Sequence, residues 1–81
     1  MSDLSRERIK LYIVTDDNWF INIDKYNEIE KVCQIEDAIS FYDEYSAIKL
    51  LESCKKLNIP CRIIKYKITY TVVEELKIKG V

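Results

Sequence analysis

The side chains that most often carry catalysis are scarce in this sequence. No histidine occurs among its 81 residues, so neither a Ser-His-Asp triad nor a Cys-His pair can form. Acidic residues occur in adjacent doublets, but neighbouring side chains on a strand or helix point apart and make poor general acid/base pairs. The doublets are Asp16-Asp17, Glu36-Asp37, Asp43-Glu44 and Glu74-Glu75. The single glycine is at position 80, which excludes a glycine-rich phosphate loop. We therefore expect a protein that is not an enzyme.

Cysteine is the remaining residue type that could bind a metal or act as a nucleophile. Cys33, Cys54 and Cys61 are odd in number, widely spaced and without a Cys-x-x-Cys motif. Three thiols without an imidazole do not make the ligand set of a structural zinc site. We interpret them as small buried apolar side chains of a reduced, cytoplasmic protein, and we expect neither a metal nor another cofactor. No run approaches the roughly 18 consecutive apolar residues of a membrane span, so we expect no membrane partner.

Charge is distributed unevenly, although 13 basic and 14 acidic residues leave the total close to neutral. Residues 24–44 carry seven acids against Lys25 and Lys31, whereas residues 55–67 carry five basic residues and no acid. This pattern predicts one acidic and one basic surface, and such surfaces concern partners rather than fold. The candidate contacts to a basic partner are Glu36, Asp37, Asp43 and Glu44.

A small set of elements must position these residues. Ile9–Thr15 alternates with period two and is rich in β-branched residues, which predicts a strand. Asp16-Asp17-Asn18 predicts a turn, and residues 19–23 resume as a strand, so the two strands form a hairpin. Residues 24–40 stay open. A loop with a short strand near 28–32 is the preferred interpretation, and the first half of a long helix is the alternative.

One helix is clearly marked further along the chain. Asp43 is its expected N-cap, and a capping box from Ser40 to Asp43 is the alternative. Asn58-Ile59-Pro60 ends it, since the residue before a proline is driven out of helical conformations. Five small or apolar residues fall on one stripe of this helix: Ala47, Leu50, Leu51, Cys54 and Leu57.

The longest strand pattern covers residues 61–73, and a charged tail follows it. The element order is then β-β-(β)-α-β. This order predicts an α+β fold, in which an antiparallel sheet consists of the hairpin and the long C-terminal strand and one main helix packs on one face. We expect a single domain over residues 1–81, with frayed ends at 1–7 and 74–81.

A single helix can cover only one face of this sheet, so the other face is left for a partner. The expected open face consists of Lys10, Tyr12, Phe20, Lys65 and Lys67. Lysines interleaved with aromatic rings suit a protein interface, a homodimer interface or stacking on single-stranded nucleic acid. Lysines that guard an edge strand against aggregation are the plain structural alternative. The residues expected to face the helix are Ile9, Leu11, Ile13, Ile21, Ile23, Ile64, Tyr66 and Ile68.

One further pattern joins the hairpin to the helix. A Tyr-Ile-Val-x-Asp-Asp-x-Trp-Phe hairpin runs from Tyr12 to Phe20, and Ala38-x-x-Phe41 precedes the helix. On these residues the run from Leu11 to Leu57 resembles small uncharacterised accessory proteins of phages and mobile elements of low-GC bacteria, from which it departs in its long acidic spacer. The resemblance implies a short strand at Ala-x-x-Phe and a viral host-takeover or anti-defence role, such as inhibition of a defence or replication enzyme. It brings no catalytic residues.

These observations predict a small binding protein whose partner is another protein. The alternative is a nucleic-acid-binding module that uses the five residues of the expected open face. The net charge of -1 favours the protein partner, because phosphate contacts require an excess of basic side chains.

Overall fold

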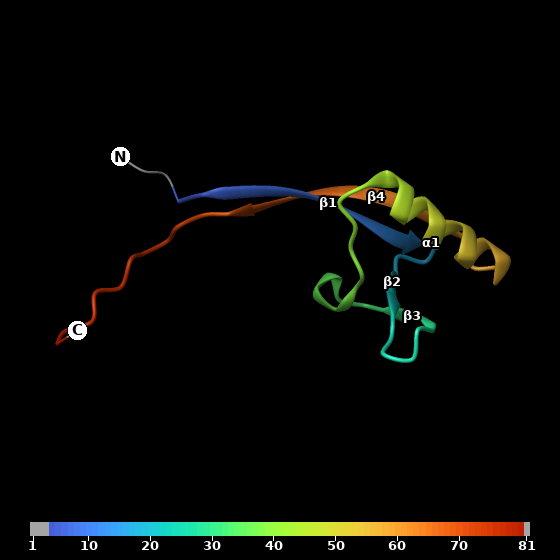
Figure 1. Ribbon diagram of the computed structural model, residues 1–81, viewed down its shortest axis with the longest axis horizontal. Helices are drawn as coiled ribbons and strands as arrows, with labels where there is room; N and C mark the ends of the chain where they lie inside the picture. The colour runs from blue at the N-terminus through green and yellow to red at the C-terminus, as the bar shows by residue number, and fades with distance from the viewer. Residues whose placement is uncertain (1–3, 81) are drawn as a thin grey trace.

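The computed structural model describes residues 4–80 and confirms the predicted α+β class. One antiparallel sheet has the strand order β3-β2-β1-β4, and one helix packs on it (Figure 1). The strands are β1 (Arg6–Thr15), β2 (Phe20–Ile23), β3 (Ile29–Val32) and β4 (Cys61–Tyr70). A 3-10 turn, η1 (Ile35–Asp37), and helix α1 (Glu44–Lys56) lie between β3 and β4 along the chain. No helix of this part of the chain is long and apolar enough to cross a membrane.

The short strand β3 confirms the preferred interpretation of residues 24–40. It forms because Asp24 organises the preceding turn: its carboxylate accepts hydrogen bonds from the backbone N–H of Tyr26 at 2.8 Å and of Glu28 at 2.9 Å. Asn27 occupies the left-handed region with φ 64°, which asparagine tolerates better than most residues. The turn returns the chain antiparallel to β2, and the helical alternative for this stretch is wrong.

The predicted hairpin is present but opens at once. β2 pairs with β1 only through Phe20 and Val14, and then runs away from it (Figure 1). The edge of β1 that β2 leaves is taken by Phe41, which exchanges two backbone hydrogen bonds of 2.8 and 2.9 Å with Leu11. The expected strand at Ala38–Phe41 is therefore reduced to one bridge. Ile39 and Phe41 nevertheless reach the core through it.

The pairing of β1 with β4 decides which side chains share a face. The register runs from Arg6 opposite Tyr70 to Thr15 opposite Cys61. Odd-numbered residues of both strands therefore face α1, and even-numbered residues face away. The fully buried centre on the helix side consists of Ile13, Ile21, Leu50 and Cys54.

The predicted orientation of β4 is wrong by one residue. Ile64, Tyr66 and Ile68 lie on the face away from the helix, while Ile63 and Cys61 pack against the core. The sequence makes Ile64, Tyr66 and Ile68 the more apolar phase, but it also places Ile63 in the other phase, so the alternation alone does not decide which phase packs on the helix. Only the register with β1 selects one, and a shift by one residue exchanges the two faces.

Helix α1 begins and ends as its sequence indicates. The Asp43 carboxylate accepts a hydrogen bond of 2.8 Å from the backbone N–H of Ser46, which confirms the expected N-cap. Ala47, Leu50 and Cys54 of the predicted stripe are buried. Leu57 lies at the C-cap, beyond the last turn, and is 59% exposed.

The end of α1 depends on a left-handed asparagine. Asn58 has φ 59°, its N–H donates to Lys55, and the N–H of Ile59 donates to Cys54. These two bonds form the Schellman pattern, in which glycine is the usual left-handed residue.

We expect Asn58→Ala to lower the free energy of unfolding by about 1 kcal/mol, because an alanine Cβ is strained in the left-handed region. Asn58→Gly is the matched control and should retain or raise the stability. Urea denaturation of both variants measures the difference. Equal stability of the two variants would contradict the role assigned to Asn58.

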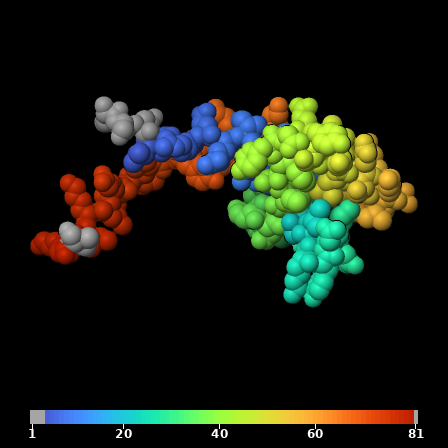
Figure 2. Space-filling model, viewed as in Figure 1, coloured from blue at the N-terminus to red at the C-terminus, as the bar shows by residue number. Residues whose placement is uncertain are grey.

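The molecule is far longer than a compact chain of its size. Its principal extents are 57, 25 and 21 Å, and its radius of gyration is 17.0 Å, against about 12 Å expected for a compact domain of this length. Figures 1 and 2 show the reason: the start of β1 and the end of β4 extend beyond the helix, and the C-terminal segment continues past them. Residues 71–78 belong to no helix or strand.

The expected frayed ends are placed only in part. Arg6 and Glu7 lie in β1, opposite Tyr70 and Thr69. Positions 1–3 and 81 lie outside the described residues. The strand expected over 61–73 ends at Tyr70 because β1, its pairing strand, begins opposite that residue.

Candidate functional site

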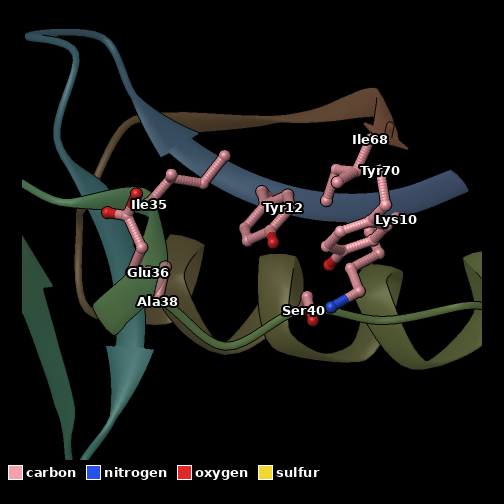
Figure 3. Close-up of a pocket in the computed structure, with 8 residues that line it drawn as sticks. All are labelled: Lys10, Tyr12, Ile35, Glu36, Ala38, Ser40, Ile68 and Tyr70. Atoms are coloured by element: carbon pink, nitrogen blue, oxygen red, sulfur yellow. The ribbon is translucent and has the colours of Figure 1, made fainter. Parts of the chain in front are cut away.

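One hollow of the described surface lies on the face away from α1. It is a groove of about 360 Å³ between the β1–β4 pair on one side and the segment around η1 on the other. Lys10, Ile68 and Tyr70 lie at one end, Ile35 and Glu36 at the other, and Tyr12 between them (Figure 3). Eight residues line this groove: Lys10, Tyr12, Ile35, Glu36, Ala38, Ser40, Ile68 and Tyr70.

Local structure explains why these residues converge. Lys10 and Tyr12 are even residues of β1, and Ile68 and Tyr70 are even residues of β4, so the pleat turns all four to one face. The chain leaves β3, turns through η1 and crosses this face before Phe41 joins the edge of β1. The crossing brings Ile35 and Glu36 over the strands.

The groove is apolar along its walls and charged at its ends. Lys10 is half-buried, and its ammonium lies 5.9 Å from the centre of the Tyr42 ring, a cation–π contact. Glu36 is exposed and makes no ion pair or hydrogen bond with any residue between 4 and 80. The groove therefore has a cation, Lys10, at one end and a carboxylate, Glu36, at the other, with an aromatic and aliphatic floor between them.

The structure places Tyr12 and Phe20 differently from the expected open face. Tyr12 is only 5% exposed and stands edge-on to two rings, with centroids 6.1 Å from Phe20 and 5.4 Å from Tyr66. Phe20 and Tyr66 are half-buried and lie 6.3 Å apart. The three rings form a second, smaller core on this face. Tyr12 contributes to the groove floor, while Phe20 supports it from behind.

Lys65 and Lys67 do not join this face. They are odd residues of β4, on the helix side of the sheet, and both are exposed. Lys67 forms an ion pair of 3.2 Å with Glu7 on β1, and both side chains are more than half exposed. The five residues of the expected open face are therefore split between the two faces of the sheet.

The four candidate acids are also separated. Glu36 enters the groove, and Asp37 lies beside it in η1 with its side chain exposed. Asp43 caps α1, and Glu44 occupies the first turn of that helix. Only Glu36 shares a site with Lys10 and Tyr12.

Sequence reasoning missed several residues around the groove. Arg6 and Arg8 lie on the same face as Lys10, because all three are even residues of β1. The alternation of Arg6, Arg8 and Lys10 in the sequence carries this signal. Ile35 carries none, since its position depends on the path of the chain after β3.

A second polar cluster surrounds the β1–β2 turn. The hydroxyl of Thr15 is buried, donates to Asp17 and accepts from the backbone N–H of Trp19 at 2.9 Å. Arg62 donates to the Thr15 carbonyl at 3.0 Å, and Lys31 contacts Asp17 at 3.4 Å. The donors and acceptors of this turn pair with each other, with Arg62 on β4 and with Lys31 on β3, so the cluster fixes the turn to the neighbouring strands. Trp19 itself is exposed at this turn.

Two carboxylates make the stability depend on acid. The hydrogen bond from Thr15 lowers the pKa of Asp17 below its ordinary 3.8, and the hydrogen bond from the Ser46 N–H lowers the pKa of Asp43. A carboxyl whose pKa is lower in the folded state stabilises the fold above its unfolded pKa. This stabilisation disappears as the pH falls through the folded pKa.

We therefore expect the free energy of unfolding to decrease as the pH falls from about 5 to below 3.8. The double variant Asp17→Asn and Asp43→Asn should show a smaller decrease over the same range. Urea denaturation at several pH values measures both slopes. Parallel curves for wild type and variant would contradict these roles.

The cysteines offer no reactive thiol in the core. Burial raises the pKa of Cys54 to about 11 and also raises that of Cys61, so both thiols stay protonated near neutral pH. The expectation that all three are buried is confirmed for Cys54, holds only in part for the half-buried Cys61, and is wrong for Cys33, which is exposed just after β3. Among residues 4–80, no three cysteine or acidic side chains gather in a way that could hold a metal ion.

Comparison with protein-family models, with curated proteins and with solved structures finds no match for this chain. The function is therefore inferred from the geometry of the groove.

Proposed function

We propose that this chain is a non-enzymatic binding module that holds a short segment of another protein in the groove between the β1–β4 pair and η1. The observation that carries the proposal is the combination of an apolar floor with two charges of opposite sign, neither of which forms an ion pair among residues 4–80. Aromatic and aliphatic walls at Tyr12, Ile68 and Tyr70 suit an apolar side chain of a partner. Lys10 suits a carboxylate next to it, and Glu36 suits a basic group.

The shape of the groove supports a small ligand segment rather than a flat interface. Its volume of about 360 Å³ matches one large side chain with its neighbours. The segment around η1 is held at Phe41 by two backbone bonds to β1, so one wall is anchored. The viral host-takeover or anti-defence role that the sequence resemblance implies stays a prediction, and a partner protein bound in the groove is compatible with it.

Selection of a displayed random-peptide library on the wild-type chain tests this proposal. We expect enriched peptides to carry an aromatic or aliphatic residue flanked by an acid and a base. Lys10→Glu and Glu36→Lys should each weaken the selected peptides about tenfold, the effect of losing one favourable charge contact in a partly buried site. Lys25→Glu and Glu28→Lys, in the β2–β3 turn, are the matched controls and should bind as wild type does. Equal loss in controls and groove variants would overturn the proposal.

A nucleic-acid partner is the second candidate, and one observation favours it. Arg6, Arg8 and Lys10 alternate along β1 on the face that also presents Tyr66 and Tyr70. A row of cations beside aromatic rings suits a single strand, whose bases stack on the rings. Fluorescence anisotropy with a mixed-sequence single-stranded oligonucleotide tests it. Binding that weakens steeply with salt and is lost in Arg8→Glu would support this candidate, and no binding at low salt would remove it.

A further inference from the structure

The outer edge of β4 is unpaired along its whole length. β4 is the last strand of the sheet, and β1 is its single pairing strand among residues 4–80. Leu11 uses both its N–H and its C=O to bind Phe41, so odd residues of β1 direct these groups away from β4 and even residues direct them towards it. Even residues of β4 lie opposite the even residues of β1, and the two sets form the hydrogen bonds between these strands. The N–H and C=O groups of Ile63, Lys65, Lys67 and Thr69 therefore point outward.

The chain after β4 is equally without a pairing strand. Residues 71–78 follow β4 beyond its last pair with β1, Tyr70 opposite Arg6, and then bend away from the line of the strand (Figure 1). Their apolar side chains are strongly exposed, with Val73 at 96%, Leu76 at 75% and Ile78 at 74%. Exposed strands with exposed apolar side chains normally mark an interaction surface. An added strand would satisfy both features: it would pair with the free backbone groups of β4 and cover the exposed apolar side chains of residues 71–78.

One antiparallel register would pair the free edge of β4 in one copy with residues 71–78 of a second copy. If β4 and its continuation meet the same segment of a second copy antiparallel, with a two-fold axis at Tyr70, residue i of one copy lies opposite residue 140 − i of the other. Residues of equal parity then face each other, and the odd residues have the outward groups that the ladder requires. The resulting hydrogen-bonded pairs are Thr69 with Thr71, Lys67 with Val73, Lys65 with Glu75, and Ile63 with Lys77.

The side chains agree with this register on both faces. Lys65 of one copy lies opposite Glu75 of the other, twice by symmetry, which places opposite charges in register. On the other face the half-buried Ile68 lies opposite the exposed Val72, the half-buried Ile64 lies opposite the exposed Leu76, and Tyr66 between them lies opposite Glu74. A two-fold axis at Tyr66 would instead place Lys65 against Lys67, and like charges directly opposite destabilise a sheet.

We propose that the chain forms a two-fold dimer in which residues 71–78 of each copy add as a strand to the free edge of β4 of the other. Each copy supplies both the edge and the strand that covers it. The interface lies on the edge of the sheet and includes the groove residues Ile68 and Tyr70, while the groove residues Lys10 and Glu36 lie outside it.

Charge reversal at the pair in register tests the proposal in solution, with mass measured by sedimentation equilibrium of the full chain. Wild type should approach twice its monomer mass of 9.7 kDa. Lys65→Glu and Glu75→Lys should each raise the dissociation constant on the order of tenfold or more, because two favourable pairs become repulsive. An equimolar mixture of these two variants should recover the dimer, since each substituted residue then meets its opposite charge. Lys25→Glu, outside the interface, is the control and should dimerise as wild type does.

Proline substitution tests the register of the backbone. Val73→Pro removes an N–H that the ladder uses and should abolish the dimer, whereas Glu74→Pro removes an N–H that points away from the second copy and should leave it intact. Both residues are exposed, so neither change disturbs the core. A wild-type chain that sediments as a monomer, or a dimer that ignores both Val73→Pro and the charge reversals, would overturn the proposal.

Discussion

Ile13→Ala is expected to lower the free energy of unfolding by about 2–4 kcal/mol. Ile13 is fully buried at the centre of the helix-side core, where it packs with Ile21, Leu50 and Cys54. Its removal loses the transfer free energy of three carbon atoms and leaves a cavity that this small core cannot close. A domain of this size has a total stability of the order of 5–10 kcal/mol, so the variant should be partly unfolded at moderate denaturant concentrations.

Ile9→Ala is the matched control for this prediction. Ile9 belongs to the same strand and the same face as Ile13, but it lies beyond the helix and is 48% exposed. Its loss should change the stability by well under half as much. Chemical denaturation of both variants by circular dichroism gives the comparison. Equal effects would contradict the difference in burial between Ile9 and Ile13.

Tyr12→Ala is expected to destabilise the fold by about 2–4 kcal/mol, although Tyr12 lies on the face away from the helix. The substitution removes a buried ring that contacts Phe20 and Tyr66 edge-on, and each such ring pair contributes roughly 0.5–1.5 kcal/mol beyond its burial. Tyr26→Ala, at an exposed turn, is the control and should leave the stability within about 0.5 kcal/mol of wild type.

The same variant separates two interpretations of Tyr12. If Tyr12 were an exposed contact residue, its removal would weaken partner binding and leave the melting temperature unchanged. Because Tyr12 is buried, we expect instead that its removal lowers the melting temperature in the absence of any partner. A thermal melt monitored by far-ultraviolet circular dichroism without any partner distinguishes them, because this signal follows the secondary structure of both wild type and variant.

Local chemistry in the sequence is enough to locate most elements. The turn at Asp16-Asp17-Asn18, the N-cap at Asp43 and the helix stop before Pro60 each depend on residues within five positions of one another. Such signals act through a few backbone hydrogen bonds and need no distant partner. The stripe of Ala47, Leu50 and Cys54 likewise follows from the helical period alone.

The sequence predicted three of the groove residues, but it did not predict that they lie in one site. Lys10, Tyr12 and Glu36 were candidates, but on two separate surfaces, one basic and one acidic. They meet because the chain after β3 crosses the sheet before it joins β1 at Phe41. That path depends on β2 leaving β1 after a single residue pair, which no local pattern in residues 19–23 encodes.

By itself, the sequence determined the α+β order, the helix with its cap, the hairpin turn and the lack of any histidine-based catalytic site, because each follows from residue type or from short-range periodicity. The tertiary structure alone decided which face each residue of β4 occupies. It turned Tyr66 away from the helix and separated Lys65 and Lys67 from Lys10. The reason is that a strand has a period of two and two possible phases, and the phase that is more apolar in the sequence, with Ile64, Tyr66 and Ile68, is not the one that packs against the helix. Only the pairing with β1 over ten residues selects the phase. The phase in turn decides that Ile68 and Tyr70 line the groove.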